Sequence, residues 1–256
     1  MSQPSRAVAD RVAITRTVLS SIDEHAPEIA KALDEVLFPD GTPKNLTTLG
    51  LLRALHDVLG RAADSMSAAD LEHVRELADD DAPQAKLDEH TETLRALLIS
   101  IRATLSSTYG AIVASSYGIP SVIPAEPEAL LIAGTTVARL LRDRPLVEPP
   151  KIKSLAIAPL AVAEDLSFAN AELKRALSEV DREKREAIVS QNAKTIAISR
   201  WLSVYQGVAE SVSGLYGVAG QTGFADAIRP TPRRLAGLPE EDDTAPSTER
   251  SRSSSG

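Results

Sequence analysis

The sequence predicts an all-α protein, an elongated helical bundle of about five to seven helices, and three observations support this fold class. Apolar residues make up 43% of the 256 residues and are mostly Ala, Leu, Ile and Val, with only 3% aromatic side chains. Ala and Leu, together with the frequent Arg and Glu, are residues that favour helices strongly. No segment alternates cleanly between apolar and polar residues, which is the pattern of a half-buried strand. The length allows a sizeable core.

Two helical segments are expected before residue 43. An apolar stripe at helical spacing begins near Arg6 and continues to Pro27. Proline lacks an amide N–H and clashes with the preceding turn, so we expect an interruption there. A second segment continues to Leu37. Residues 38–43, FPDGTP, then have the composition of a tight turn.

Three further helices are expected between residues 47 and 143. The first covers residues 47–78. The next begins near Asp81, a good N-cap residue, and runs to about Tyr117. Residues 118–124 contain two prolines and form a loop. The third helix covers residues 127–143.

The second part of the chain is dominated by one long helical pattern. Residues 144–154 are a predicted connector, because three prolines within six residues favour an extended, semi-rigid chain. From Pro159 an apolar stripe with a period near 3.5 residues reaches Tyr216, and no Gly or Pro occurs before Gly207. Residues 155–229 are therefore either a long helical hairpin that breaks near 181–185 or a single long helix of about sixty residues, which would span roughly 90 Å. Its stripe needs the first half of the chain, or another subunit, to cover it.

The chain is therefore divided into an N-terminal helical bundle (1–143), a proline-rich connector (144–154), the long helical region (155–229, with a short helix around 224–228) and a tail (230–256). The tail is rich in Pro, Ser, Thr and charged residues and is predicted to be disordered, because it cannot bury enough apolar surface. Deleting residues 231–256 should then leave thermal stability unchanged.

A weak internal repeat leaves open whether the bundle consists of two related helical halves. Tyr117-Gly118 and Tyr216-Gly217 align at an offset of 99 residues, and three further identities accompany them. Five identities over about 35 positions are only modestly above chance in a sequence of such biased composition.

Charge and cysteine content exclude several classes of protein. The net charge of −8 argues against a general nucleic-acid binder, because phosphate contacts need a concentrated basic face. The chain has no cysteine, which excludes disulfides, thiolate nucleophiles and cysteine-ligated zinc. The polar N-terminus, MSQPSRAVADR, lacks the hydrophobic region of an export signal. We therefore expect a cytoplasmic protein that does not bind nucleic acid.

Residues 103–125 contain no charged side chain, and their 23 positions reach the length of a membrane-spanning helix. Seven of the positions are Ser or Thr, however, and Pro120 and Pro124 interrupt the pattern. A buried helix tip, where small residues let helices approach closely, is the favoured interpretation. A membrane-active or membrane-associated protein that uses residues 103–125 is the alternative.

One arrangement has the spacing of metal ligands. Asp70, His73 and Glu76 lie three residues apart, near one face of a predicted helix. Carboxylate-bridged metal bundles use Glu-x-x-His, but they take this motif from two helices, and the sequence has no second copy. His73 also follows Met66 by seven residues on the apolar stripe, as a partly buried histidine would. These three residues remain candidates only, and no metal or cofactor is assigned.

Catalytic motifs are absent from the sequence. There is no G-x-S-x-G, and all four histidines lie in the first 90 residues without a recognisable local motif. Arg139, Arg142 and Arg144 cluster near a predicted helix end, where positive charge interacts favourably with the helix dipole. Binding of a phosphate or an acid is the alternative for this cluster.

The expected function is that of a non-enzymatic helical interaction or assembly protein, an adaptor or structural subunit with coiled-coil-like packing. A protein partner or self-association would cover its long apolar stripe. Two alternatives stay open: a membrane-active protein that uses residues 103–125, and a helical ligand- or metal-binding enzyme.

Overall fold

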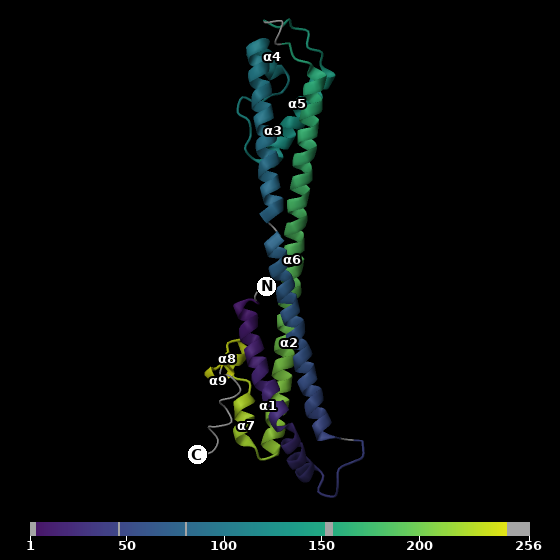
Figure 1. The fold of residues 1–256 in the computed structure, drawn as a ribbon, viewed down its shortest axis with the longest axis vertical. Coiled ribbons are helices and arrows are strands. Elements are labelled where there is room, and N and C mark those ends of the chain that lie inside the picture. Colours follow the sequence, from purple (N-terminus) through teal and green to yellow (C-terminus); the bar gives the residue numbers. More distant parts are fainter. Residues whose placement is uncertain (1–3, 46, 80, 152–155, 245–256) are drawn as a thin grey trace. The chain divides into compact units, whose positions relative to one another are not determined.

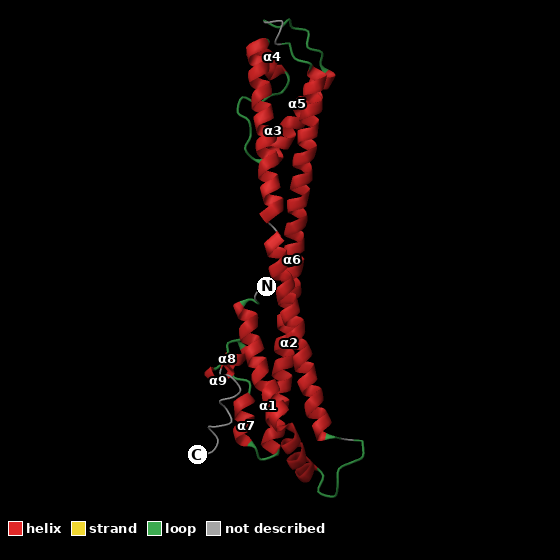
Figure 2. Cartoon of the chain, viewed as in Figure 1, coloured by secondary structure: helices red, strands yellow, loops and turns green. Residues whose placement is uncertain are grey.

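The computed structural model describes residues 4–45, 47–79, 81–151 and 156–244. Regular secondary structure in these residues is helical throughout, which confirms the predicted fold class (Figures 1 and 2). The helices in chain order are α1 (Arg6–Leu37), α2 (Thr48–Asp79), α3 (Asp81–Thr108), α4 (Ala111–Ser116), α5 (Pro127–Asp143), α6 (Pro159–Val218), α7 (Thr222–Ile228), α8 (Pro232–Leu235) and α9 (Glu241–Thr244).

The described residues divide into two compact units, each with its own core. Unit 1 comes from residues 1–75 and 188–256, and unit 2 from residues 76–187. α2 and α6 each contribute residues to both units. The sequence-based division at 144–154 differs from these limits, because that segment lies inside unit 2.

α6 is one continuous helix of 60 residues, so the break considered near residues 181–185 does not occur. Its interior contains no Gly or Pro before Gly207, and its composition favours helix over most of its length. Its first part buries Leu166 and Leu173 in unit 2, and its last part buries Trp201 and Tyr205 in unit 1.

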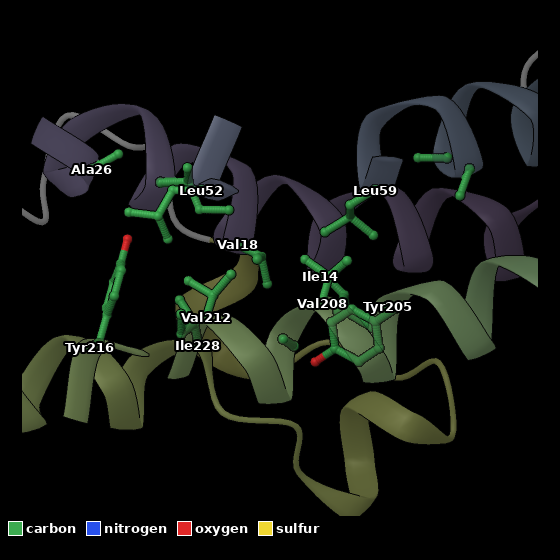
Figure 3. Packing of buried hydrophobic residues seen from close by; sticks show 14 of the residues in the cluster. Ile14, Val18, Ala26, Leu52, Leu59, Tyr205, Val208, Val212, Tyr216 and Ile228 are labelled. Carbon is green, nitrogen blue, oxygen red and sulfur yellow. The ribbon is translucent and has the colours of Figure 1, made fainter. Parts of the chain in front are cut away.

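The core of unit 1 collects apolar side chains from α1, α2, α6 and α7, which point toward one another in Figure 3. Two hydrogen bonds connect α6 to α1 inside this core. The Trp201 indole Nε1 donates to the Thr15 hydroxyl at 2.8 Å, and the Tyr216 hydroxyl donates to the Ser21 carbonyl oxygen at 3.0 Å. Buried donors are thus satisfied across the α1–α6 contact.

The core of unit 2 is built from α3, α4, α5 and the first part of α6, with Leu94, Leu130 and Leu166 fully buried. The segment that follows α5 is fastened to this core. The Tyr117 hydroxyl donates to the Arg144 carbonyl oxygen at 3.4 Å, and the Lys151 amide donates to the Thr108 carbonyl oxygen at 2.9 Å.

Two predicted helix boundaries are wrong. Pro27 lies inside α1 without ending it, because the burial of Ile22, Ile29 and Leu33 offsets the local cost of the proline. The helix expected to reach residue 117 stops at 108 and restarts at 111. Gly110 has a φ of 112°, which residues with a Cβ rarely adopt, and its amide donates to the carbonyl oxygen five residues earlier, so the chain turns there between the two helices.

Part of the predicted tail is helical. Residues 230–244 contain α8 and α9, and α9 contacts α1. Arg234 and Asp243 are both buried and form an ion pair, with Arg234 Nη2 at 2.9 Å from Asp243 Oδ1. A polar composition suggested disorder, but this mutual neutralisation lets the segment pack. The remainder of the predicted tail, residues 245–256, lies outside the described residues.

The uncharged tract 103–125 contributes to the core of unit 2. Val113, Tyr117, Ile119 and Ile123 are buried there. None of the helices in the described part of the chain combines the length and hydropathy that a membrane span requires.

Candidate functional site

Asp70 is a completely buried carboxylate held by three donors. The Ser5 amide lies 2.6 Å from Oδ2, and the Ser5 hydroxyl lies 2.8 Å from Oδ1. Lys194 of α6 adds an ion pair, with its Nζ at 2.7 Å from Oδ1. Burial alone would raise the pKa of Asp70, but the hydrogen bonds from Lys194 and Ser5 outweigh it and lower the pKa below its ordinary value. The arrangement joins α2 to α6 and to the residue that precedes α1.

His73 contacts α6 through a serine. Its Nδ1 lies 3.0 Å from the Ser190 hydroxyl oxygen, and the tautomer decides which group donates. Serine–histidine pairs at this distance can activate a nucleophile. Ser190 lies in the interior of α6, however, where backbone N–H groups are hydrogen-bonded within the helix. They cannot serve there as oxyanion donors.

Glu76 lies in unit 2, in a group of three glutamates. The carboxylate oxygens of Glu76, Glu183 and Glu186 are within 4.8 Å of one another, and such oxygens suit a hard cation. Arg182 already neutralises part of this charge, with Nη2 at 2.7 Å from a Glu183 oxygen. The structure therefore gives Asp70, His73 and Glu76 different partners and does not gather them into one set of ligands.

A hollow of about 470 Å³ opens in unit 2 beside the end of α5. Its volume is within the usual range of small-molecule sites. Arg142 donates to the Ser167 hydroxyl at 2.6 Å, and Arg144 donates to the Ser116 carbonyl oxygen at 2.7 Å. Neither arginine forms an ion pair with a carboxylate of the described residues. The hollow is lined by Tyr109, Leu141, Arg142, Arg144, Pro145, Leu146, Glu148, Pro150, Ile157, Pro159 and Leu160.

The α6 outer face is an exposed stripe of unit 1 on which neighbouring members are alternately four and three residues apart. This spacing follows one side of a helix that packs as a coiled coil. Ile196 is 69% exposed and Val189 is 67% exposed. All members are exposed, and they are Val189, Ala193, Ile196, Arg200, Ser203, Gly207, Glu210, Gly214 and Gly217.

Two features of the α6 outer face are unusual for a solvent-facing helix. Between residues 195 and 218 the sequence has only two charged residues, Arg200 and Glu210. A Cβ added at Gly207, Gly214 or Gly217 would meet nothing within 4 Å. Packing within the described chain therefore does not require these glycines, although glycine weakens a helix interior. The face can accept a closely approaching partner helix.

Sequence reasoning named Arg142 and Arg144 as part of a possible acid-binding cluster but did not predict the hollow that they line, and it did not find the α6 outer face. The scarcity of charge between residues 195 and 218 was a visible signal for the second. Which side of α6 faces the core could be decided only once α1 and α2 were in place.

Comparison with models of protein families, with curated proteins and with solved structures finds no match to this chain.

Proposed function

We propose that this protein is a non-enzymatic helical assembly subunit that associates with itself through the α6 outer face. The observation that carries this proposal is the long, exposed and nearly uncharged stripe on α6. A solvent-facing helix normally presents charged residues on its outer side. Here Val189 and Ile196 are exposed instead, and covering such side chains contributes roughly 1.5–3 kcal/mol each.

The hydroxyl groups on this surface would not oppose burial. Ser203 donates to the Ser199 carbonyl oxygen at 3.2 Å, and the exposed Ser211, which borders the α6 outer face, donates to the Gly207 carbonyl oxygen at 2.6 Å. Because these hydroxyls are satisfied within α6, a partner can cover them without leaving an unpaired polar group. Small residues and self-satisfied hydroxyls together favour close contact with another helix.

Size-exclusion chromatography with light scattering tests the proposal. We expect a mass of about twice the 27.2 kDa chain for the wild type. Ile196→Asp should return the mass to that of one chain, because it would place a charge in the contact. Ile132→Asp is the matched control, since Ile132 is 68% exposed on α5, and it should keep the wild-type mass. A wild type that stays monomeric at high concentration would refute self-association.

A second candidate function, ligand binding, is favoured by the hollow in unit 2. An organic acid with an apolar body would match its chemistry, because Arg142 and Arg144 can pair with a carboxylate and Leu141, Leu146 and Ile157 are apolar. Decanoate is a suitable probe, with decanol as the uncharged control. In titration calorimetry we expect Arg142→Gln to weaken decanoate binding about tenfold. Arg139→Gln should not weaken it, since Arg139 pairs with Asp143 and does not line the hollow. Equal binding of decanoate and decanol would refute this role for the arginines.

The membrane-active alternative has less support. Tract 103–125 would have to release Val113, Tyr117 and Ile123 from the core of unit 2 before it could insert into a bilayer. Vesicle flotation tests it directly, and binding to vesicles by the folded protein would reopen it.

A further inference from the structure

We infer that the α6 outer face binds a second copy of this chain in antiparallel orientation, with the twofold axis between Ser203 and Gly207, at the level of residue 205 along the helix. The inference rests on the proposed self-association and adds the identity, direction and register of the partner. It follows from the order of residues along the stripe: when a second copy of the stripe is laid against the first in the opposite direction, opposite charges face each other and large side chains face small ones.

The charges are placed symmetrically about residue 205. Arg200 precedes this position by five residues, and Glu210 follows it by five. In an antiparallel pair centred at 205, each Arg200 faces the Glu210 of the other copy, so two opposite-charge contacts form. Arg200 has no ion pair with a carboxylate of the described residues, and Glu210 accepts one hydrogen bond, from Gln206 Nε2 at 3.0 Å. A parallel pair would instead place Arg200 against Arg200 and Glu210 against Glu210, which is repulsive.

The side-chain sizes follow the same symmetry. In the antiparallel register Ile196 faces Gly214 of the second copy, and Ala193 faces Gly217. Ser203 faces Gly207 next to the axis. A large side chain on one helix therefore meets a glycine on the other, which allows close packing without a void. A parallel register would place isoleucine on isoleucine and glycine on glycine, with a bulge at one level and a gap at another.

The three glycines are explained by this register. Each weakens α6, and none is needed for contacts within the described chain. In the antiparallel pair each glycine lies opposite a side chain or next to the axis, where a Cβ would hold the helices apart. The same geometry is used where helices pack closely through small residues.

Cysteine cross-linking tests the direction, because the chain has no cysteine of its own. Two variants, Ile196→Cys and Gly214→Cys, are prepared, one of them with an affinity tag, and each is oxidised alone and after mixing. We expect a disulfide only in the mixture. The two copies of position 196 would be roughly 27 Å apart along α6 in the antiparallel pair, far beyond the reach of a disulfide.

The outcomes separate this inference from the proposed function. A wild type that is monomeric in light scattering overturns both. A dimer in which Ile196→Cys cross-links to itself keeps self-association and overturns the antiparallel direction. A dimer with no disulfide in any mixture overturns the register. Circular dichroism of each variant establishes that it is folded.

Charge reversal tests the pairing. We expect Arg200→Glu and Glu210→Arg each to raise the dimer dissociation constant about tenfold in sedimentation equilibrium. The double variant should recover wild-type affinity, because the two reversed charges again face opposite partners. Arg185→Glu, an exposed reversal elsewhere on α6, is the control and should leave the constant unchanged. A double variant as weak as the single ones would overturn the Arg200–Glu210 pairing.

Discussion

Removing the Asp243 carboxylate should destabilise unit 1, because it leaves the Arg234 guanidinium buried without its counter-charge. Arg234 Nε lies 2.9 Å from Oδ2 of Asp243, and Nη2 lies 2.9 Å from Oδ1, so the pair is bidentate. Nη1 donates to the carbonyl oxygens of Ala227 at 2.8 Å and Arg229 at 3.1 Å. Arg234 is 3% exposed and Asp243 is 6% exposed.

The magnitude follows from this burial. Deleting one partner of a buried ion pair costs about 3–5 kcal/mol, because the remaining charge loses both its partner and its hydration. Arg234 regains its full hydration only if residues 229–244 leave the core of unit 1, although it also lines a hollow of about 600 Å³. The loss for Asp243→Ala is therefore the smaller of the ion-pair cost and the free energy with which this segment is held. The double variant Arg234→Met, Asp243→Leu should recover most of the loss, because neither new side chain needs a polar partner.

The assay is urea unfolding followed by fluorescence of Trp201, the only tryptophan. This ring lies close to the segment, since Arg11 is 5.8 Å from the ring centroid and Gly237 packs against the Arg11 guanidinium. Asp226→Ala removes an exposed carboxylate near the same segment and should change the free energy of unfolding by less than about 0.5 kcal/mol. A loss below about 1 kcal/mol for Asp243→Ala, in a protein that loses more than this when residues 230–244 are removed, would refute the reasoning.

The same geometry reverses an expectation drawn from composition. A tail that buries nothing could be deleted without effect, but Arg234 and Asp243 in the predicted tail are buried. A chain that ends at residue 229 should therefore unfold at lower urea concentration than one that ends at residue 244. Equal midpoints would show that residues 230–244 do not contribute to stability.

Three further predictions concern single residues. Asp70→Asn should lower the free energy of unfolding by about 3 kcal/mol at pH 7. Because the folded pKa of Asp70 is lowered, the stabilisation by its carboxylate is complete above pH 3.8 and is lost as the pH falls through the folded pKa. Urea titrations of the wild type and the variant should therefore converge in acid. Tyr205→Phe removes a buried hydroxyl that has no hydrogen-bond partner in the described chain, so we expect a gain of up to about 1 kcal/mol. Burial raises the pKa of Tyr205 to about 12, so between pH 10 and 12 the unfolded chain loses this proton before the folded chain does, and the wild type should lose stability. If Tyr205→Phe loses as much stability over the same pH range, the ionisation of Tyr205 is not the cause. Gly118→Ala should lower the free energy of unfolding by about 1–2 kcal/mol, because Gly118 has a φ of 74°. Gly60→Ala should raise it by about 0.5–1 kcal/mol, because Gly60 lies inside α2 and an added Cβ would meet nothing within 4 Å. Thermal unfolding measures both changes, and a gain in stability at Gly118 would contradict the argument.

Local sequence was sufficient for the helices whose limits depend on local chemistry. α5 covers residues 127–143 as expected, because Pro127 suits a first helical turn and Pro145 disfavours continuation. α6 begins at Pro159 as predicted and is uninterrupted where Gly and Pro are absent. Propensity and proline placement act over a few residues, so they can be assessed without knowledge of the fold.

The sequence by itself determined the all-α class, the limits of α5 and the start of α6. The tertiary structure decided that α1 continues through Pro27, that Asp70 pairs with Lys194, and that Arg234 and Asp243 pack as a pair. Each of these depends on residues distant in sequence or on burial that offsets a local cost. The α6 outer face is also a feature that the tertiary structure decided. Its scarcity of charge could be seen in the sequence, but its exposure follows only from the packing of α1 and α2 against the opposite side of α6.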